Sequence, residues 1–516
     1  MPLLLGASLA LGALSLLVPS APTTDPWGWI VWGRELVHLR LDTVAGPPSW
    51  KPLPVLFTAP LSLLGGAAPA AWIAVARAGG ILALAFAYRL AARLAGPVAG
   101  ILAVVALALS ELWLRGLEHG YSEGLAVALL LWAIESHLDG HRGRALLLGG
   151  LVALSRPEAW PLAVAYGAST RPRAWWVAVA APPLLWLLPD WWGSGDPFHA
   201  DAAAQVNLLR TGPHPGLLVL RETWGILAWP VWAGAAVAIG LAVRRRDWTT
   251  AVLGGGAAAW IAGVAAATEL GYPGSGRFLV VPAAVACVLG AAGVVSFATW
   301  RSGTAAMRRP GPAAAALLAV VTLPWLVPRV AALPTSLRQS VVRARFEHDL
   351  STSVARAGGP AAVLSRGRPE IPSRLWWAAG ELAWDLDVPL ERIGKVPEAR
   401  LATPCGVPAG AVVFAPVAGT PPDDSAWQPA HPRARTLAAA GIWRLLVDRP
   451  PSLRRCAPSR RCRASGTTSS ASPPACARTS PRPGPTTLRR SCSSTAGRST
   501  STCGVTSSRA SATASG

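Results

Sequence analysis

The sequence predicts an all-α polytopic membrane bundle with a small C-terminal α/β domain and a disordered tail. Three observations predict this fold class. Hydrophobic residues make up 52% of the 516 residues and charged residues only 14%, against roughly 25% charged residues in a soluble domain. Long apolar runs recur between residues 3 and 330, and a bilayer core needs about 20 such residues per helix. Short arginine clusters separate the runs, which argues against a large soluble enzyme.

The apolar runs predict a bundle of about 11 membrane helices, because one run counts as two half-helices. The first run lacks a preceding basic segment, which favours an uncleaved first helix over a signal peptide. The runs cover residues 3–18, 69–88, 98–114, 124–138, 145–169, 174–189, 223–243, 248–268, 278–300 and 311–328.

Arginine-rich loops predict the orientation. They contain Arg89 and Arg93, Arg142 and Arg144, Arg171 and Arg173, Arg244 to Arg246, and Arg301 with Arg308 and Arg309. The positive-inside rule makes these loops cytoplasmic. The run 145–169 must then enter and return at its helix-breaking centre, residues 155–158. We expect a multi-pass plasma-membrane protein with a cytoplasmic N-terminus and an extracytoplasmic C-terminal domain.

Composition divides the chain into residues 1–330, 331–449 and 450–516. The middle part has ordinary globular composition. Its β-like runs lie at 361–364, 411–415 and 443–447, and its helix-like stretch lies at 373–384. This alternation predicts a small mixed α/β domain outside the membrane.

The tail from Pro450 to Gly516 carries eleven Arg with no Asp, Glu or Lys, and five of the seven Cys. Its Ser/Thr/Pro-rich composition cannot bury a core. Three interpretations stay open: a polyanion-binding arm, a solvated linker, or a shifted reading frame of GC-rich DNA. Without the tail, the formal net charge falls from +21 to +10, and much of that comes from the cytoplasmic loops. We therefore expect no nucleic-acid partner, and the Cys spacing predicts no zinc site or disulfide.

Asp25 follows the first helix in a Trp-rich exterior loop that continues to Lys51. A carboxylate just outside a lipid-facing helix is well placed to act as general base on an incoming hydroxyl. Asp25 also precedes Pro26, so a helix cap is the structural alternative, and the two roles are compatible.

Further candidates lie where other apolar runs meet the exterior. His119 and Glu123 lie between two runs, and Glu123 could bind acceptor hydroxyls or assist Asp25; an Arg115–Glu118 surface pair is the structural alternative there.

Arg156 and Glu158 lie at the centre of the re-entrant run, where a salt bridge that locks the turn is the favoured interpretation. Arg277 ends a Gly-rich loop and suits a phosphate at headgroup depth, with a snorkelling arginine as the alternative. No phosphate-cradling GxxxxGK[ST], HExxH or nucleotide fingerprint is present.

The order of these features resembles the GT-C superfamily of membrane glycosyltransferases, which includes protein O-mannosyltransferases, aminoarabinose transferases, and actinobacterial arabinosyl- and mannosyltransferases. The resemblance covers about residues 1–330. Many relatives have adjacent acidic residues in the first loop, whereas Pro26 follows Asp25 here, so no metal site is expected. The motifs are Asp25 in the first exterior loop, Lys51-Pro52-Leu53-Pro54, the segment GLVALSRPE at 150–158, Gly195-Asp196-Pro197-Phe198, and Gly276-Arg277-Phe278.

The resemblance implies an enzyme that moves a hexose or pentose from a polyprenyl-phosphate donor to an extracytoplasmic hydroxyl, with inversion. Asp25 would be the base, Glu123 the second acidic group and Arg277 a phosphate ligand. The expected partners are the bilayer, the lipid-linked sugar and a glycan or protein acceptor, with no cofactor. Two alternatives stay open, a lipid-linked glycan transporter or flippase and a non-catalytic envelope assembly protein. The other candidates for donor binding are Lys51, Arg156, Glu158 and His119.

Overall fold

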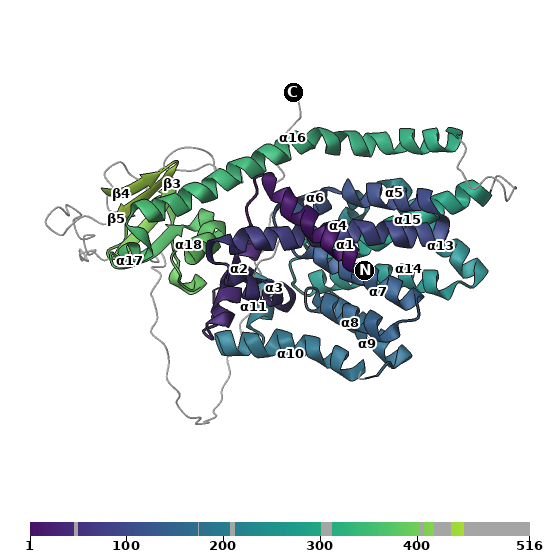
Figure 1. Ribbon diagram of the computed structural model, residues 1–516, viewed down its shortest axis with the longest axis horizontal. Helices are drawn as coiled ribbons and strands as arrows, with labels where there is room; N and C mark the ends of the chain where they lie inside the picture. The colour runs from purple at the N-terminus through teal and green to yellow at the C-terminus, as the bar shows by residue number, and fades with distance from the viewer. Residues whose placement is uncertain are drawn as a thin grey trace, which may run out of the picture. The chain divides into compact units, whose positions relative to one another are not determined.

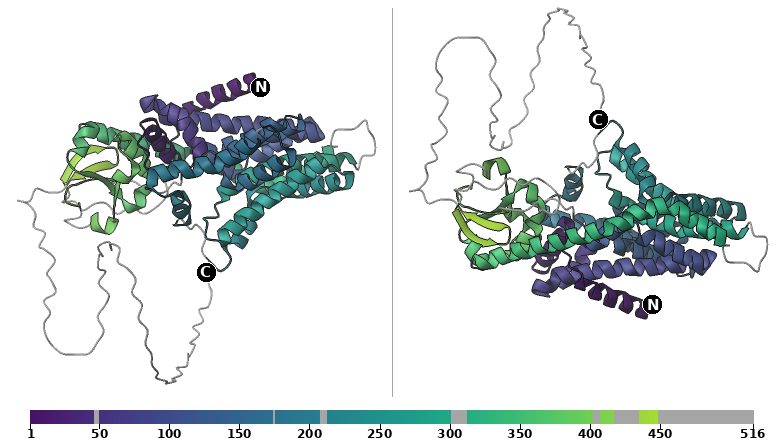
Figure 2. Two further views of the ribbon diagram at one scale, coloured as in Figure 1. Left: turned by 90° about the horizontal axis from the view of Figure 1, so that it is seen from below. Right: turned by 90° about the horizontal axis from the view of Figure 1, so that it is seen from above.

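The computed structural model describes residues 1–45, 50–173, 175–206, 212–300, 312–401, 407–416 and 435–447. The predicted tail lies outside these residues. In the described part, helices form a bundle over the first 300 residues, and α16 (Pro312–Arg356) continues to a small sheet. Figure 1 shows α16 along the bundle, and both views of Figure 2 show its far end beside the strands, which it contacts.

Proline begins many of the bundle helices, because its fixed φ suits the first turn and its missing N–H costs nothing there. The bundle helices are α1 (Pro2–Leu14), α2 (Thr24–Val37), α3 (Pro52–Ser62), α4 (Ala68–Ala95), α5 (Pro97–Ala108), α6 (Glu111–Glu118), α7 (Glu123–Leu138), α8 (Arg142–Ala153), α9 (Trp160–Thr170), α10 (Trp175–Ser194), α11 (His199–Val206), α12 (Pro215–Ile226), α13 (Trp229–Arg245), α14 (Trp248–Glu269) and α15 (Val280–Trp300). Short 3₁₀ helices are η1 (Ser15–Leu17), η2 (Gly65–Ala67), η3 (Pro157–Ala159) and η4 (Gly276–Leu279).

Three helices of the described part are long and apolar enough to cross a membrane, at 65–95, 248–269 and 276–298. Two bent pairs raise this number to five if each pair is one span. These helices support a multi-pass membrane protein. The predicted count of about 11 membrane helices stays a prediction. Its half-helix pair corresponds to α8 and α9, which have 12 and 11 residues, about half of a bilayer crossing each.

Two predicted runs are broken in the structure. The run 98–114 divides into α5 and α6, and the run 223–243 divides into α12 and α13, which meet at a 98° bend. Pro230 in the first turn of α13 explains the second break, since proline has no N–H to donate to the Ile226 carbonyl and its ring clashes with that carbonyl. The run 145–169 is two short helices, α8 and α9, separated by η3, as the helix-breaking centre predicted.

The C-terminal α/β region (residues 357–447) contains one five-stranded sheet in the order β2-β1-β3-β5-β4. Strand β1 pairs in parallel with β2 and β3, while β5 pairs antiparallel with β3 and β4. Its elements are α17 (Gly359–Leu364), β1 (Arg368–Pro372), η5 (Ser373–Ala378), α18 (Ala379–Asp385), η6 (Leu390–Arg392), β2 (Gly394–Val396), α19 (Glu398–Leu401), β3 (Ala411–Pro416), β4 (Arg435–Ala440) and β5 (Trp443–Val447).

The α/β character of this region agrees with the prediction, but one of the predicted strands is a helix in the structure. Residues 361–364 form helix α17, because Pro360 starts a helix and Ala and Leu favour it. The predicted runs at 411–415 and 443–447 are strands β3 and β5, and the predicted helix 373–384 is η5 followed by α18. The division proposed at residue 330 falls inside α16, which runs without a break across it.

Helix α2 packs into the core of the C-terminal region. One hydrophobic cluster joins Trp27, Trp29 and Trp32 of α2 to Leu382 of α18 and Trp443 of β5. The start of α2, where Asp25 lies, is therefore built between the bundle and the sheet.

Candidate active site

Several helix N-termini come together at one group of ionisable side chains. Asp25 is in the first turn of α2, Lys51 is the N-cap of α3, and Glu123 is the first residue of α7. Arg156 precedes η3, and Arg277 lies in η4, directly before α15. Helix N-termini carry partial positive charge, so the backbone here favours anions in addition to the side-chain cations.

Arg277 is the centre of this group. Its Nη1 donates to Asp25 Oδ2 at 2.8 Å, and its Nε donates to Glu123 Oε1 at 2.9 Å. The guanidinium carbon lies 3.5 Å from the centroid of the Tyr121 ring, which holds the planar group by a cation–π contact. Nη2 is buried and has no hydrogen-bond partner among the described residues. One nitrogen of Arg277 is thus left for a ligand beside Asp25.

Glu123 joins the two arginines. Its Oε1 accepts from Arg156 Nη2 as well as from Arg277, and both Glu123 and Arg156 are almost fully buried. Arg156 also lies over the Phe278 ring, 4.9 Å from its centroid. Glu123 therefore holds two guanidiniums through one oxygen, and its predicted contact with an acceptor stays a prediction.

The predicted salt bridge between Arg156 and Glu158 is wrong. Arg156 pairs with Glu123, and one carboxylate oxygen of Glu158 is buried without a hydrogen-bond partner. Side chains two residues apart in a helical turn do not face each other, and η3 begins between these two residues. The structure therefore does not bring Glu158 into the ion cluster.

Lys51 has no carboxylate in contact. Its Nζ lies 5.2 Å from the Trp29 ring centroid, and no hydrogen bond or ion pair of this side chain occurs among the described residues. Burial, followed by the positive charges of Arg156 and Arg277, lowers the pKa of Lys51 to about 8. A buried ammonium without a counter-ion is a ready partner for an anionic ligand.

His119 lies at the edge of the cluster. Its ring is edge-on to Tyr121, with 6.1 Å between ring centroids, and its backbone carbonyl accepts from the Thr23 N–H. Burial lowers the pKa of His119 to about 4, and Arg343, Arg115 and Arg277 contribute in the same direction. His119 is therefore neutral near pH 7 and adds no positive charge for a phosphate.

An apolar cavity of about 540 Å³ begins close to the ion cluster. Its lining near the cluster includes Ala159, Trp260 and Val281, and the Trp260 indole N–H donates to the Phe278 carbonyl. The rest of the lining comes from α7, α8, α9, α14 and α15 and is mostly aliphatic. The ion cluster does not line this cavity but adjoins it, since Arg156 lies over the Phe278 ring and Trp260 lines the cavity.

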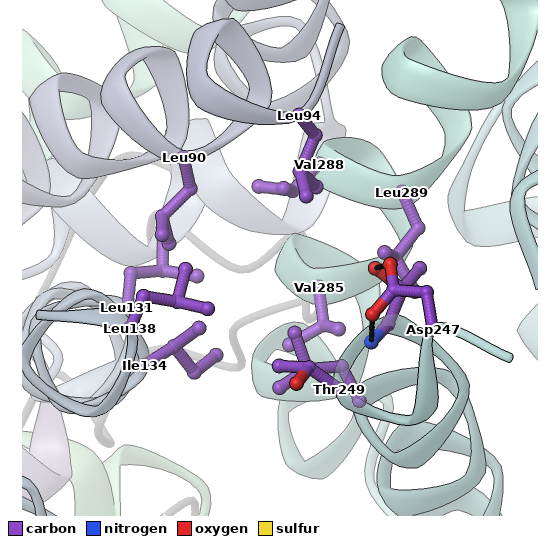
Figure 3. A pocket seen from close by; sticks show the side chains of 12 residues that line it. Leu90, Leu94, Leu131, Ile134, Leu138, Asp247, Thr249, Val285, Val288 and Leu289 are labelled. Atoms are coloured by element: carbon purple, nitrogen blue, oxygen red, sulfur yellow. Dashed lines mark hydrogen bonds between the residues drawn. The ribbon is translucent and has the colours of Figure 1, made fainter. Parts of the chain in front are cut away.

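A second, smaller cavity of about 130 Å³ adjoins this one through Ile134, Thr249, Leu253 and Val285, which line both. Figure 3 shows leucine and valine side chains of α4, α7 and α15 directed into it. Asp247 closes its edge and accepts from the Thr250 N–H. The apolar space therefore extends well away from Asp25.

Most of the candidate residues come together in the structure. Asp25, Glu123, Arg156 and Arg277 form one ion cluster, and Lys51 acts on all four electrostatically. Phe278, the aromatic support under Arg156, belongs to the motif Gly276-Arg277-Phe278, whereas Tyr121 under Arg277 has no sequence signal that separates it from interface aromatics. The cavity lining also has no distinct signal, since every bundle helix is rich in Ala, Leu and Val.

Solved structures similar to this chain include ArnT from Cupriavidus metallidurans in the apo state, at 14% identity over 86% of this chain and 97% of that chain, with a TM-score of 0.46. ArnT bound to undecaprenyl phosphate matches over the same shares with a TM-score of 0.45. The oligosaccharyltransferase AglB from Archaeoglobus fulgidus, with an inhibitory peptide and a dolichol-phosphate, matches at 14% identity and a TM-score of 0.45. That match covers 74% of this chain and 63% of that chain.

The likenesses to ArnT and AglB are likenesses of fold at 14% identity. No protein-family model matches the chain, and no curated protein matches it in sequence.

Proposed function

We propose that this chain is an integral membrane glycosyltransferase of the GT-C type, which moves a sugar from a polyprenyl-phosphate donor to an acceptor hydroxyl on the extracytoplasmic side. One observation carries the proposal: a carboxylate and a partly unpaired cation cluster lie about one helical turn from residues that line an apolar cavity. A phosphate joined to a long hydrocarbon chain has this same division of charge and apolar surface.

The cations fit a donor of single negative charge. Lys51, Arg156 and Arg277 carry three positive charges, and Asp25 and Glu123 carry two negative ones, which leaves an excess of +1. A polyprenyl-phosphate sugar is a phosphodiester with one negative charge and would neutralise this excess. Lys51 Nζ and the free Nη2 of Arg277 are the donors in place to bind it.

The apolar cavity would hold the prenyl chain. A prenyl chain in the bilayer already lies in hydrocarbon, so its fit in the cavity would rest on van der Waals packing along its length. Binding cavities span about 300–1,000 Å³. The cavity of about 540 Å³ falls in this range. Its low polarity also argues against a path for a polar glycan across the bundle, which the transporter alternative requires.

In the proposed reaction, Asp25 takes the proton of the acceptor hydroxyl while the oxygen of that hydroxyl attacks the anomeric carbon. The bond between this carbon and the phosphate oxygen breaks, and its electron pair stays on the phosphate. Arg277 and Lys51 stabilise the charge that builds on the departing phosphate. Because Arg277 also holds Asp25, one side chain places the base next to the donor. Attack on the side opposite to the phosphate inverts the anomeric centre.

The replacement Asp25→Asn tests the base assignment. In purified full-length protein in nanodiscs, supplied with polyprenyl-phosphate mannose or arabinose and envelope acceptors, we expect transfer to fall by roughly 10²- to 10⁴-fold, with donor binding retained. Asp42→Asn is the matched control, because the Asp42 carboxylate follows the same helix and, within the described part of the chain, accepts from the Val44 N–H alone. Full transfer by Asp25→Asn would refute the base assignment.

Glycan analysis of a deletion strain tests the function itself. Mass spectrometry of envelope glycans and lipid-linked sugars should show loss of one sugar from the envelope together with unused donor. An unchanged envelope glycome with accumulated precursor on the cytoplasmic side would instead indicate transport. The sugar and the acceptor would be identified by the same measurement.

A further inference from the structure

Helix α2 carries Asp25 in its first turn and Arg34 nine residues later, about 13 Å along the helix axis. Arg34 is buried, with 8% of its surface exposed, and it lies outside the ion cluster around Arg277. Its partners all belong to the C-terminal α/β region. The helix that carries the proposed base is therefore held from its other end by that region.

The Arg34 side chain binds the C-terminal end of α18. Nη2 donates to the carbonyls of Val388 and Ala383, at 2.9 and 3.3 Å, and Nη1 donates to the Trp384 carbonyl at 3.1 Å. The guanidinium also lies over the Trp384 ring. A helix C-terminus carries partial negative charge and leaves carbonyls free, so a buried arginine is well matched to it.

The end of α18 is shaped for this contact. The N–H groups of Val388 and Asp387 donate back to the carbonyls of Ala383 and Trp384, which is the Schellman pattern. Asp387 takes a positive φ of 53°, where glycine is usual and other residues cost about 1 kcal/mol. Its carboxylate lies 3.1 Å from Arg34 Nη1. The strained residue thus supplies the counter-ion of Arg34.

A second contact fixes α2 near Asp25. A Cβ atom on Gly380 would lie 2.5 Å from the Cβ of Trp27, so helices α2 and α18 touch with no room for a side chain. Trp27 is two residues from Asp25. On the other face of α2, the Thr58 hydroxyl of α3 donates to the Trp29 carbonyl. Helix α2 therefore lies between α3 and α18 without freedom to rotate.

We propose that the C-terminal α/β region sets the position of the base, and that Arg34 is the positioning residue through which it does so. Asp25 reaches Arg277 only if α2 keeps its placement against α18. The C-terminal region is thus part of the catalytic machinery, in addition to any part it has in binding an acceptor. This inference rests on the proposed function.

The test compares Arg34→Ala with Arg40→Ala in the full-length protein in nanodiscs. Arg40 is the matched control, because it faces the same Asp387 at 3.8 Å but is 57% exposed and makes no carbonyl contact in the α18 end. For Arg34→Ala we expect kcat to fall by roughly 10- to 100-fold, as for misplacement by about 1 Å. The donor KM should stay within about threefold, since the donor cations do not move. Arg34→Lys should recover part of the rate, and Arg40→Ala should match the wild type.

Gly380→Ala and hydrogen exchange separate positioning from loss of folding. The added methyl group must displace α2 from α18, so this variant should show the same loss of kcat at unchanged donor KM. Amide exchange in residues 24–37 should rise in Arg34→Ala and Gly380→Ala but not in Arg40→Ala. Wild-type kcat and exchange in both variants would overturn the inference, as would a KM that rises in step with the loss of kcat. If the wild type transfers no sugar, the proposed function fails, while the exchange comparison still decides the placement of α2.

Discussion

Arg277 shows how one residue can organise a site through several atoms. Its three nitrogens have three different environments: Nη1 holds Asp25, Nε holds Glu123, and Nη2 is unpaired. A lysine at this position would supply one point charge without the planar fork. The fork is what allows the base and the donor phosphate to share a single cation in the proposed reaction.

Lys51 gives the site a testable pH dependence. Burial and the two arginines lower its pKa to about 8, so the ammonium loses its proton as pH rises through this value. Donor binding by the free enzyme should then weaken, and kcat/KM for the donor should fall above about pH 8, since this ratio reports free-enzyme pKa values. The measurement is a pH profile of kcat/KM with a polyprenyl-phosphate sugar.

Lys51→Arg is the matched variant for that profile. Arginine stays charged throughout the accessible pH range, so the alkaline fall should move to higher pH or disappear. A profile of Lys51→Arg that falls at the same pH as the wild type would show that another group controls the alkaline side.

At the scale of elements, the sequence predicted where one apolar run breaks, but it did not predict which of the other runs are straight helices and which are bent. The centre of the run 145–169 breaks where Pro157 removes a donor, as expected. The break between α12 and α13 carries a similar signal at Pro230, but the apolar residues around it concealed the 98° bend. Periodicity cannot distinguish a straight span from a bent one, because both are apolar throughout.

The candidate residues could be selected from sequence because ionisable groups are rare in apolar segments. Their pairing could not. Arg156 has Glu158 two residues away, yet it binds Glu123 from 33 residues earlier. Which carboxylate pairs with Arg156 depends on how η3 packs against α7, and no motif in the sequence indicates that packing. Arg34 was missed for the same reason, since its partners lie about 350 residues further along the chain.

The apolar cavity can be tested with a glycine that faces it. Gly256 of α14 lines the cavity, and a Cβ added to it would have no atom within 4 Å. Gly256→Leu should fill part of the space that the prenyl chain would occupy. We expect the donor KM to rise several-fold for long-chain donors, with little change for short-chain analogues, because only the long chain reaches this part of the cavity.

Gly255→Leu is the control in the same helix. Gly255 also has open space at its Cβ position, but it is exposed and does not line the cavity. Both substitutions raise helix propensity alike, so a difference between them isolates the effect of filling the cavity. Equal KM values for the two variants with a long-chain donor would contradict the proposed position of the prenyl chain.

On the scale of the whole molecule, the bundle and the C-terminal region share one structural unit. Helix α16 passes from one to the other without a break, and α2 contributes its tryptophans to the core that contains the sheet. The base is attached to this shared core, whereas the donor cations Lys51, Arg156 and Arg277 belong to the ends of bundle elements. The proposed reaction therefore requires the bundle and the C-terminal region to be correctly placed relative to each other. Any condition that loosens their contact should reduce sugar transfer.

A rise in pH is one such condition, because three carboxyl groups are buried where α16 meets α18. Burial raises the pKa of Glu347 and Glu381, and for Glu381 the neighbouring charges of Glu347 and Asp385 raise it further. Burial also raises the pKa of Asp385 to about 6. Arg343 opposes these shifts at Glu347 and Glu381, and the Ser351 hydroxyl donates to Asp385.

Groups whose pKa is higher in the folded protein stabilise it fully below their unfolded pKa, and this contribution is lost as pH rises through the folded value. The contribution of these carboxyl groups to the contact between α16 and α18 should therefore be greatest below about pH 4 and should be lost through neutral to alkaline pH. Thermal unfolding followed by tryptophan fluorescence between pH 5 and 9 measures this slope. Glu381→Gln should flatten it, since a neutral amide cannot ionise, whereas Glu391→Gln, at an exposed position, should leave it unchanged. A wild-type unfolding temperature that does not fall with pH, or an equal slope in Glu381→Gln, would show that these carboxyl groups do not control the contact.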